Sequence, residues 1–229
     1  VRRLAGAPVV VRPASRLDQG VSAEAFTVDA WMPGLPGAHQ PEPLRNLGLA
    51  LAGALPDDLS VRRIAVVEDT WNAQHAARTK TYRYTVTVRG TKPVLRPRCW
   101  WVRQLDHPER LQALANQLLG VKDLRLFANL RHDGSDDDLR ERTIFSADWQ
   151  PGLAGDLIFR ISGTGFLYKQ IRGFVGAMVH LAQGRRDLTE FSALIAGDTS
   201  IKRLGNIAPP AGLMLERVTY DPEPPWRTL

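Results

Sequence analysis

The sequence predicts an α+β fold whose sheets are built mainly from antiparallel strands. Strand-like and helix-like segments are mixed along the chain without strict βα alternation. One segment, residues 81–89, alternates cleanly between apolar or aromatic and polar residues, as a half-buried strand does. The 229 residues are 44% hydrophobic and 24% charged, which is typical of a globular protein with a sizeable core.

In the first third of the chain, valine-rich runs predict short strands. They cover residues 9–13, 26–28 and 61–67. The first strand is expected to be buried, and it leads into a loop where Gly20 is free to adopt a positive φ. Proline and glycine predict a loop over residues 33–43. Leucines at helical spacing predict a helix over residues 43–55, which Pro56 ends.

In the rest of the chain, apolar spacing predicts helices between further strands. The expected helices cover residues 111–119, 171–182 and 191–196, and the expected strands cover 81–89, 157–162 and 214–220. Gly173 and Gly176 give the second of these helices a thin side, where another element can approach closely. The aspartate-rich residues 131–142 predict a solvated loop. Metal binding there lacks support, because no pattern of His or Glu surrounds the aspartates.

The charge balance favours a polyanionic partner. The chain has 30 Lys and Arg against 24 Asp and Glu, a net charge of +6. Most of the cations are arginines, whose planar guanidinium donates two parallel hydrogen bonds to phosphate. No apolar run has the length of a membrane span, and the start has no signal-peptide core. The single cysteine, Cys99, fits a reducing compartment, so we expect a cytoplasmic protein.

The residues Ser15–Ala23, which read SRLDQGVSA, contain the best candidate for chemistry. Arg16 and Asp18 lie two residues apart on a loop at a strand end, where scaffolds commonly place functional side chains. Asp-x-Gly is also ordinary turn chemistry. The five histidines are scattered and predict neither a zinc site nor a Ser-His-Asp triad. A carboxylate-dependent hydrolase would need a second positioned carboxylate, and none is obviously paired with Asp18.

This loop resembles the G-R-T-D-x-G-V signature of the tRNA pseudouridine synthases that act on the anticodon arm, the tRNA pseudouridine synthase A family. Further segments are similar to motifs of that family in the same order, and they are residues 55–62, 77–84, 120–127, 165–176 and 211–215. Each motif is weak alone, but their order and spacing together are specific and cover nearly the whole chain.

The resemblance implies the pseudouridine synthase fold. This fold has two ferredoxin-like halves, with antiparallel sheets joined around a central RNA-binding cleft. Residues 1–90 would form the first half and residues 91–229 the second. The family begins earlier than Val1, so a first strand is expected to be absent from this chain. The resemblance also implies an isomerase that converts uridine to pseudouridine in the anticodon stem-loop of tRNA. It would act as a homodimer, without a cofactor or a metal.

The resemblance assigns roles to individual residues. Asp18 would be the catalytic nucleophile, Arg172 would pair with it, and Tyr82 would stack near the target base. A guanidinium beside a buried carboxylate favours its ionised form, which a nucleophile needs. Without the resemblance, Arg172 would be read as a surface arginine and Tyr82 as a core aromatic. The candidates for substrate binding are Arg16, Gln74, Arg78, Tyr82 and Lys169.

Two residues depart from the family pattern. Leu17 stands where the family has threonine, which removes a hydroxyl group beside Asp18. Gln74 stands where the family motif F-H-A-R has an arginine thought to help displace the target base. These departures leave open an alternative, in which the chain is a catalytically weakened or inactive RNA-binding paralogue.

Overall fold

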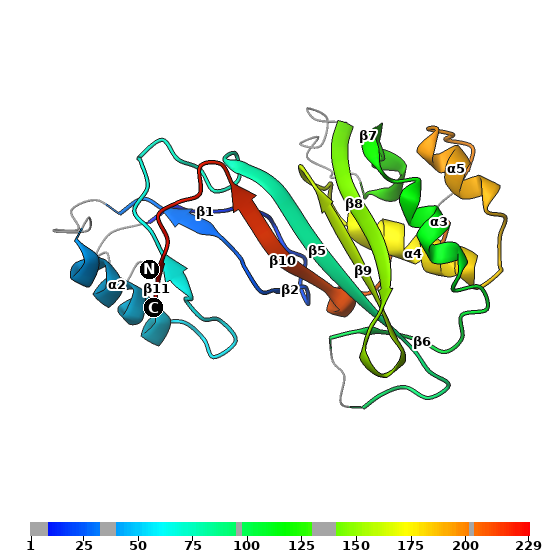
Figure 1. Cartoon of the computed structure of the whole chain (residues 1–229), viewed down its shortest axis with the longest axis horizontal. Helices are drawn as coiled ribbons and strands as arrows, with labels where there is room; N and C mark the ends of the chain where they lie inside the picture. The colour runs from blue at the N-terminus through cyan, green and yellow to red at the C-terminus, as the bar shows by residue number, and fades with distance from the viewer. Residues whose placement is uncertain (1–8, 33–39, 95–97, 130–140, 202–203) are drawn as a thin grey trace. The chain divides into compact units, whose positions relative to one another are not determined.

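The structure is a computed structural model that describes residues 9–32, 40–94, 98–129, 141–201 and 204–229 (Figure 1). The chain forms two compact units. Unit 1 comprises Val1–Arg16, Phe26–Arg78 and Thr219–Leu229, and unit 2 comprises Leu17–Ala25 and Thr79–Val218. Each unit is therefore assembled from separate stretches of sequence, whereas the expected halves divide the chain once, after residue 90. That the halves are ferredoxin-like remains a prediction.

In its described residues, unit 1 combines the helix α2 with two small antiparallel sheets. Its elements are β1 (Val11–Pro13), β3 (Val28–Ala30), α2 (Pro41–Ala54), β4 (Arg63–Ile64) and β11 (Arg227–Thr228). Strand β1 pairs with β3, and β4 pairs with β11. The prediction of a helix ended by Pro56 is confirmed, because α2 ends at Ala54. The strand expected over residues 61–67 is reduced to Arg63–Ile64.

The prediction that the first strand is buried is wrong. Val10 and Val11 are 71% and 44% exposed. The sheet of β1 and β3 turns its polar side inward. There Arg12 forms an ion pair with Asp29 at 2.6 Å, and Asp29 also accepts a hydrogen bond from the backbone N–H of Ala73 at 2.7 Å. The valine side of a two-stranded sheet is left facing outward.

Unit 2 is built on a sheet with the strand order β2-β10-β5-β9-β8-β7, in which β6 also pairs with β5. The strands are β2 (Ser22–Ala23), β5 (Ala77–Val88), β6 (Trp100–Val102), β7 (Gly120–Asp123), β8 (Glu141–Pro151), β9 (Asp156–Gly163) and β10 (Leu213–Tyr220). The pairs β5–β9, β8–β9 and β7–β8 are antiparallel, in agreement with the predicted fold class. The pairs β2–β10 and β5–β6 are parallel, so the sheet is mixed.

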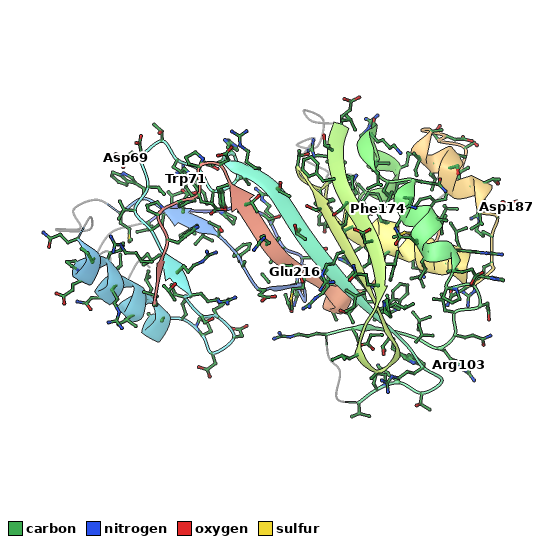
Figure 2. All side chains as sticks on the ribbon, in the orientation of Figure 1. Asp69, Trp71, Arg103, Phe174, Asp187 and Glu216 are labelled. Atoms are coloured by element: carbon green, nitrogen blue, oxygen red, sulfur yellow. The ribbon has the colours of Figure 1, made fainter. Side chains whose placement is uncertain are left out.

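Helices cover one face of this sheet and bury an aromatic core. Figure 1 shows α3 (Arg110–Asn116), α4 (Gln170–Ala182) and α5 (Thr189–Ile195) together on one side of it. Phe174 of α4, labelled in Figure 2, lies 5.1 Å between ring centroids from Phe127. Phe127 lies at the same distance from Phe191 of α5. Tyr82, Tyr84 and Val86 of β5 are buried, as the alternating pattern predicts.

The thin side predicted for the helix over residues 171–182 is confirmed. A Cβ atom on Gly173 would lie 1.9 Å from the carbonyl oxygen of Phe127, and one on Gly176 would lie 2.2 Å from that of Asn206. Only glycine therefore allows these two backbone segments to approach α4 so closely.

Two expected loops fall largely outside the described residues. Of the loop expected over residues 33–43, residues 41–43 already belong to α2. Of the loop expected over residues 131–142, residues 141–142 already belong to β8. None of the helices in the described ranges is both long and apolar enough to cross a membrane.

Candidate active site

The loop that carries Asp18 contains a tight turn and is held by the strand that follows it. Gly20 has a φ of +86°, as the sequence predicts, and the backbone N–H of Val21 donates to the carbonyl oxygen of Asp18 at 3.1 Å. After the turn, β2 pairs with β10, and the N–H of Glu24 donates to the carbonyl of Leu215 at 2.8 Å. The sheet of unit 2 therefore holds the aspartate loop.

The side chains of Asp18 and Arg172 form an ion pair within unit 2. Nη1 of Arg172 donates to Oδ2 of Asp18, and the two side chains are only 11% and 19% exposed. The pairing that the resemblance implies is thus present. Because little water surrounds the pair, the attraction is screened less than that of a surface pair. The ion pair holds the Asp18 carboxylate in one orientation.

Tyr82 lies on β5 of the same unit and is 5% exposed. Its ring meets that of Phe166 edge to face, with centroids 5.4 Å apart and planes at 88°. Phe166 belongs to the turn that leads into α4, the helix that carries Arg172. Tyr82 therefore has the burial and ring contact of a core aromatic, and its role at the target base stays a prediction.

Lys169 begins the helix that carries Arg172. It is the residue before α4 and has a φ of +60°, in the left-handed region that residues other than glycine rarely adopt. Its ammonium lies 4.6 Å from the centroid of the Tyr168 ring, a cation–π contact. A non-glycine residue held in this conformation beside a candidate active site is a form of local strain that functional sites often keep.

The other candidates for substrate binding belong to unit 1. Arg16, Gln74 and Arg78 are all exposed. Oδ1 of Asn72 accepts hydrogen bonds from the backbone N–H groups of Gln74 and His75 at 2.9 and 3.0 Å, which fixes this turn. The structure therefore brings Asp18, Tyr82, Lys169 and Arg172 into one unit and places the remaining candidates in the other.

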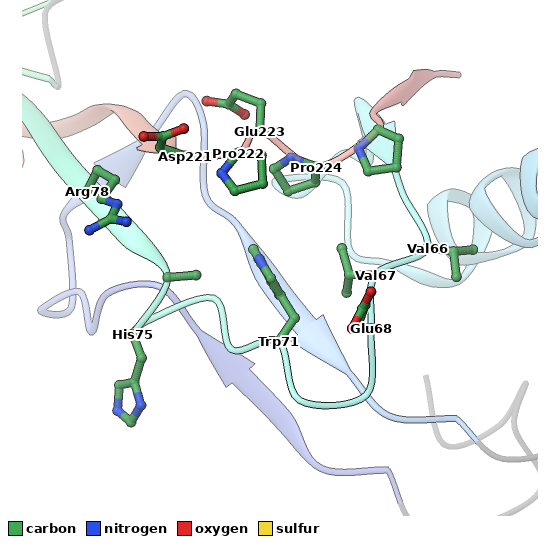
Figure 3. Close-up of a pocket in the computed structure, with 12 residues that line it drawn as sticks. Val66, Val67, Glu68, Trp71, His75, Arg78, Asp221, Pro222, Glu223 and Pro224 are labelled. Atoms are coloured by element: carbon green, nitrogen blue, oxygen red, sulfur yellow. The ribbon is translucent and has the colours of Figure 1, made fainter.

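Arg78 lines a cavity of about 560 Å³ in unit 1. The cavity is bounded by Trp71 and by residues of the C-terminal segment, among them Pro222 and Pro224, which lie above the Trp71 indole in the view of Figure 3. The ring of Trp71 also packs on that of Tyr220, with centroids 5.1 Å apart. None of Asp18, Tyr82 and Arg172 lines this cavity.

Sequence reasoning missed two polar side chains of the same unit. Gln170 is 1% exposed, and it accepts a hydrogen bond from the N–H of Leu167 and donates one to the carbonyl of Leu124, each at 3.0 Å. It thereby fixes the turn before α4. Lys80, two residues before Tyr82 on β5, has its pKa lowered by burial and by the charge of Arg142. A glutamine inside an apolar helical stripe was the available signal for Gln170.

Carboxylate, imidazole and thiol groups do not gather around any metal position in the described ranges. Within them, no group of three or more His, Cys, Asp or Glu side chains is placed to hold a metal ion.

Comparisons with known proteins agree with the sequence motifs. Residues 114–221 match the family model described as tRNA pseudouridine synthase. The chain is 32% identical to a protein of Myxococcus xanthus named tRNA pseudouridine synthase A, over 100% of this chain and 83% of the relative. It is 31% identical to the protein of that name from Chlamydia trachomatis serovar L2b, over 99% of this chain and 82% of the relative. A protein of the same name from Lactococcus lactis subsp. cremoris (strain MG1363) is 29% identical, over 94% of this chain and 82% of the relative.

Proposed function

The chain belongs to the tRNA pseudouridine synthase A family, a family of isomerases, and from this premise we propose that it converts uridine to pseudouridine in the anticodon stem-loop of tRNA, with Asp18 as the nucleophile. The observation that carries the proposal is the ion pair of Asp18 and Arg172, two largely buried side chains from distant parts of the sequence. A buried pair of this kind is expensive to desolvate, so it is weak as a device for stability alone.

The chemistry assigned to Asp18 is covalent catalysis. The carboxylate attacks the nucleoside, and the bond between the ribose and the uracil nitrogen breaks. The uracil then rotates, its carbon 5 forms a bond to the ribose carbon, and the bond between that carbon and Asp18 breaks. Carbon 5 loses its hydrogen as a proton to water, and the uracil nitrogen N1 gains a proton. Splitting one difficult exchange into two easier steps lowers the barrier. Arg172 holds the carboxylate aimed at the nucleoside, and the proposed steps use neither a metal nor a cofactor.

Tyr82 is assigned to the target base. An extruded base has two exposed faces, and an aromatic ring at the site can stack on one of them. The contact with Phe166 holds the Tyr82 ring at the start of the turn into α4. Its position in the same unit as Asp18 and Arg172 supports this assignment.

Binding of tRNA is assigned to cations of both units and to a dimer. Arg16, Arg78 and Lys169 would contact phosphate or the target nucleotide, and Gln74 would occupy the position of the family's arginine. We propose a cytoplasmic homodimer in which two ferredoxin-like halves, residues 1–90 and 91–229, enclose a central RNA-binding cleft. The net charge of +6 supports a polyanionic partner.

The second candidate function is an RNA-binding paralogue with little or no catalysis. It is favoured by Gln74, which is exposed and uncharged where the family motif has an arginine. Leu17 beside Asp18 adds to it, because no hydroxyl group is available at that position.

The experiment that separates the two functions uses tRNA labelled with tritium at carbon 5 of uridine. Rejoining through carbon displaces that hydrogen into water, so an isomerase releases tritium from a tRNA with uridines in its anticodon arm. A matched tRNA without those uridines should release none. Binding of both tRNAs without any tritium release would support the paralogue instead.

A further inference from the structure

The segment of residues 206–212, called here the 206–212 bridge, contacts the first turn of α4 at Arg172. The backbone N–H of Ala208 donates to the carbonyl of Arg172 at 3.0 Å, and the carbonyl of Ala208 accepts from Nε of Arg172 at 2.7 Å. The guanidinium is planar, so fixing Nε also restricts the direction in which Nη1 points. Nη1 is the atom that donates to Asp18.

Tyr84 anchors the same segment to β5. Its hydroxyl donates to the carbonyl oxygen of Pro209 at 2.7 Å, one residue after Ala208. Its ring leaves no room for a side chain at Gly212, where a Cβ atom would lie 2.6 Å away. Tyr84 is fully buried, and burial raises its pKa, so the hydroxyl keeps the proton that it donates.

The bridge also touches the aspartate loop. The ring of Pro210 lies 3.3 Å from the position of a Cβ atom on Gly20, two residues after Asp18. One short segment therefore contacts the helix of Arg172, the strand of Tyr84 and the loop of Asp18. All of these residues belong to unit 2.

We propose that Tyr84 is a positioning residue for the pair of Arg172 and Asp18. Its hydroxyl holds the carbonyl of Pro209, and this keeps the neighbouring carbonyl of Ala208 where it orients the Arg172 guanidinium. The catalytic consequence rests on the proposed function, because the pair matters for rate only if Asp18 is the nucleophile. Small errors in the placement of a reacting group lower rates strongly, which makes such an anchor effective.

The test compares Tyr84→Phe with the matched control Tyr220→Phe. The Tyr220 hydroxyl also donates to a backbone carbonyl, that of Ala73 at 3.1 Å, but in unit 1. We expect Tyr84→Phe to lower kcat for tritium release about tenfold, the rate equivalent of one hydrogen bond, with KM for tRNA unchanged. The control should keep the wild-type kcat, with rates compared where all proteins are fully folded.

A second readout does not depend on activity. In protein labelled with nitrogen-15 in arginine, the Nε–H of Arg172 should exchange slowly with water in the wild type and faster in Tyr84→Phe. An unchanged exchange rate, or a kcat loss no larger than that of Tyr220→Phe, would overturn the proposal. If the wild type itself releases no tritium, the proposed function fails, and the exchange measurement alone decides whether Tyr84 positions Arg172.

Discussion

Arg172 and Asp18 lie 154 residues apart in the sequence, and Arg172 donates a hydrogen bond to the Asp18 carboxylate. The same guanidinium is held from its other side by the carbonyl of Ala208. This relationship ties the aspartate loop to the first turn of α4. It also gives a carboxylate with little exposure a charge partner.

Loss of the cation at position 172 should abolish most of the activity. In Arg172→Met, Asp18 is left largely buried without its partner, so the free energy of unfolding should fall by about 3 kcal/mol. Because the carboxylate is also no longer held in place, kcat/KM should fall roughly a hundredfold. Arg172→Lys keeps the charge but cannot donate to both Asp18 and Ala208 from one planar group, so an intermediate loss is expected. The measurement is tritium release from labelled tRNA at several substrate concentrations.

Arg160→Met is the matched control for Arg172→Met. Arg160 pairs with Glu216 at 3.1 Å, but the two side chains are 36% and 23% exposed. A pair this exposed contributes about 0–1 kcal/mol, so the control should stay near wild-type activity. Equal losses in Arg172→Met and Arg160→Met would contradict a special role for the buried pair.

The space around two glycines predicts opposite effects of their substitution by alanine on the free energy of unfolding. Gly173 is closely packed in α4, and Gly53 is open in α2. Gly173→Ala forces a methyl group against the Phe127 carbonyl and should lower the free energy of unfolding by about 3 kcal/mol. Gly53→Ala lies near the end of α2, where a Cβ atom meets nothing within 4 Å, and should raise it by about 0.5 kcal/mol. Urea unfolding of both variants measures the difference. A Gly173→Ala protein as stable as the wild type would mean that the two segments are not so close.

Acid should destabilise the protein through His180. Burial, together with the charges of Arg185 and Arg186, lowers the pKa of His180 below its usual 6.5, against the opposing effect of Glu190. The unfolded chain then binds the proton more readily. The contribution to stability is therefore complete above pH 6.5 and is lost as the pH falls through the folded pKa.

The test measures the free energy of unfolding in urea from about pH 7.5 to about pH 5.5, the range around the ordinary histidine pKa. His180→Gln removes the titrating group, so its stability should fall less over this range than that of the wild type. Identical pH profiles for the two proteins would show that other groups cause the acid sensitivity.

The departure at position 74 gives a gain-of-function prediction. Extruding a base costs a few kcal/mol of stacking, and a guanidinium can fill part of the vacated stack while it binds phosphate. Gln74→Arg should therefore raise turnover on tRNA, by about fivefold for each kcal/mol recovered. Gln74→Lys, which cannot stack in the same way, is the control. If Gln74→Arg leaves turnover unchanged in an active enzyme, another residue, such as His75 or Arg78, supplies the function.

Local patterns predicted the elements that are long and periodic. Strand β5 has the alternation of Tyr82, Tyr84 and Val86, and α4 has a continuous apolar stripe, so both were found. The bounds of α4 were nearly correct, whereas β5 begins four residues before the predicted strand. Strands β6, β7 and β8 were not assigned. Their pairing depends on distant partners, as between Val86 and Trp100 in the parallel pair β5–β6, which no local period encodes.

In the candidate site too, some features could be predicted from the sequence and others could not. Family motifs predict site roles for Asp18, Tyr82 and Arg172, and the structure pairs Asp18 with Arg172. Arg172 alone would read as a surface arginine. The sequence could not predict that the Ala208 carbonyl and the Tyr84 hydroxyl would support that arginine. A backbone carbonyl has no sequence signature, and a tyrosine on an apolar face reads as core. The prediction that the first strand is buried was wrong, because the inward side of the β1–β3 sheet carries the ion pair of Arg12 and Asp29.

The most direct measurement of the central claim compares Asp18→Asn with the wild type in tritium release and in tRNA binding. Asparagine keeps the shape of the side chain but is not a nucleophile, so release should fall by about a thousandfold or more while the Kd for tRNA changes little. Asp57→Asn, at an exposed position in unit 1, should match the wild type in both assays. Release by Asp18→Asn at a rate near that of the wild type would contradict the assignment of Asp18 as the nucleophile.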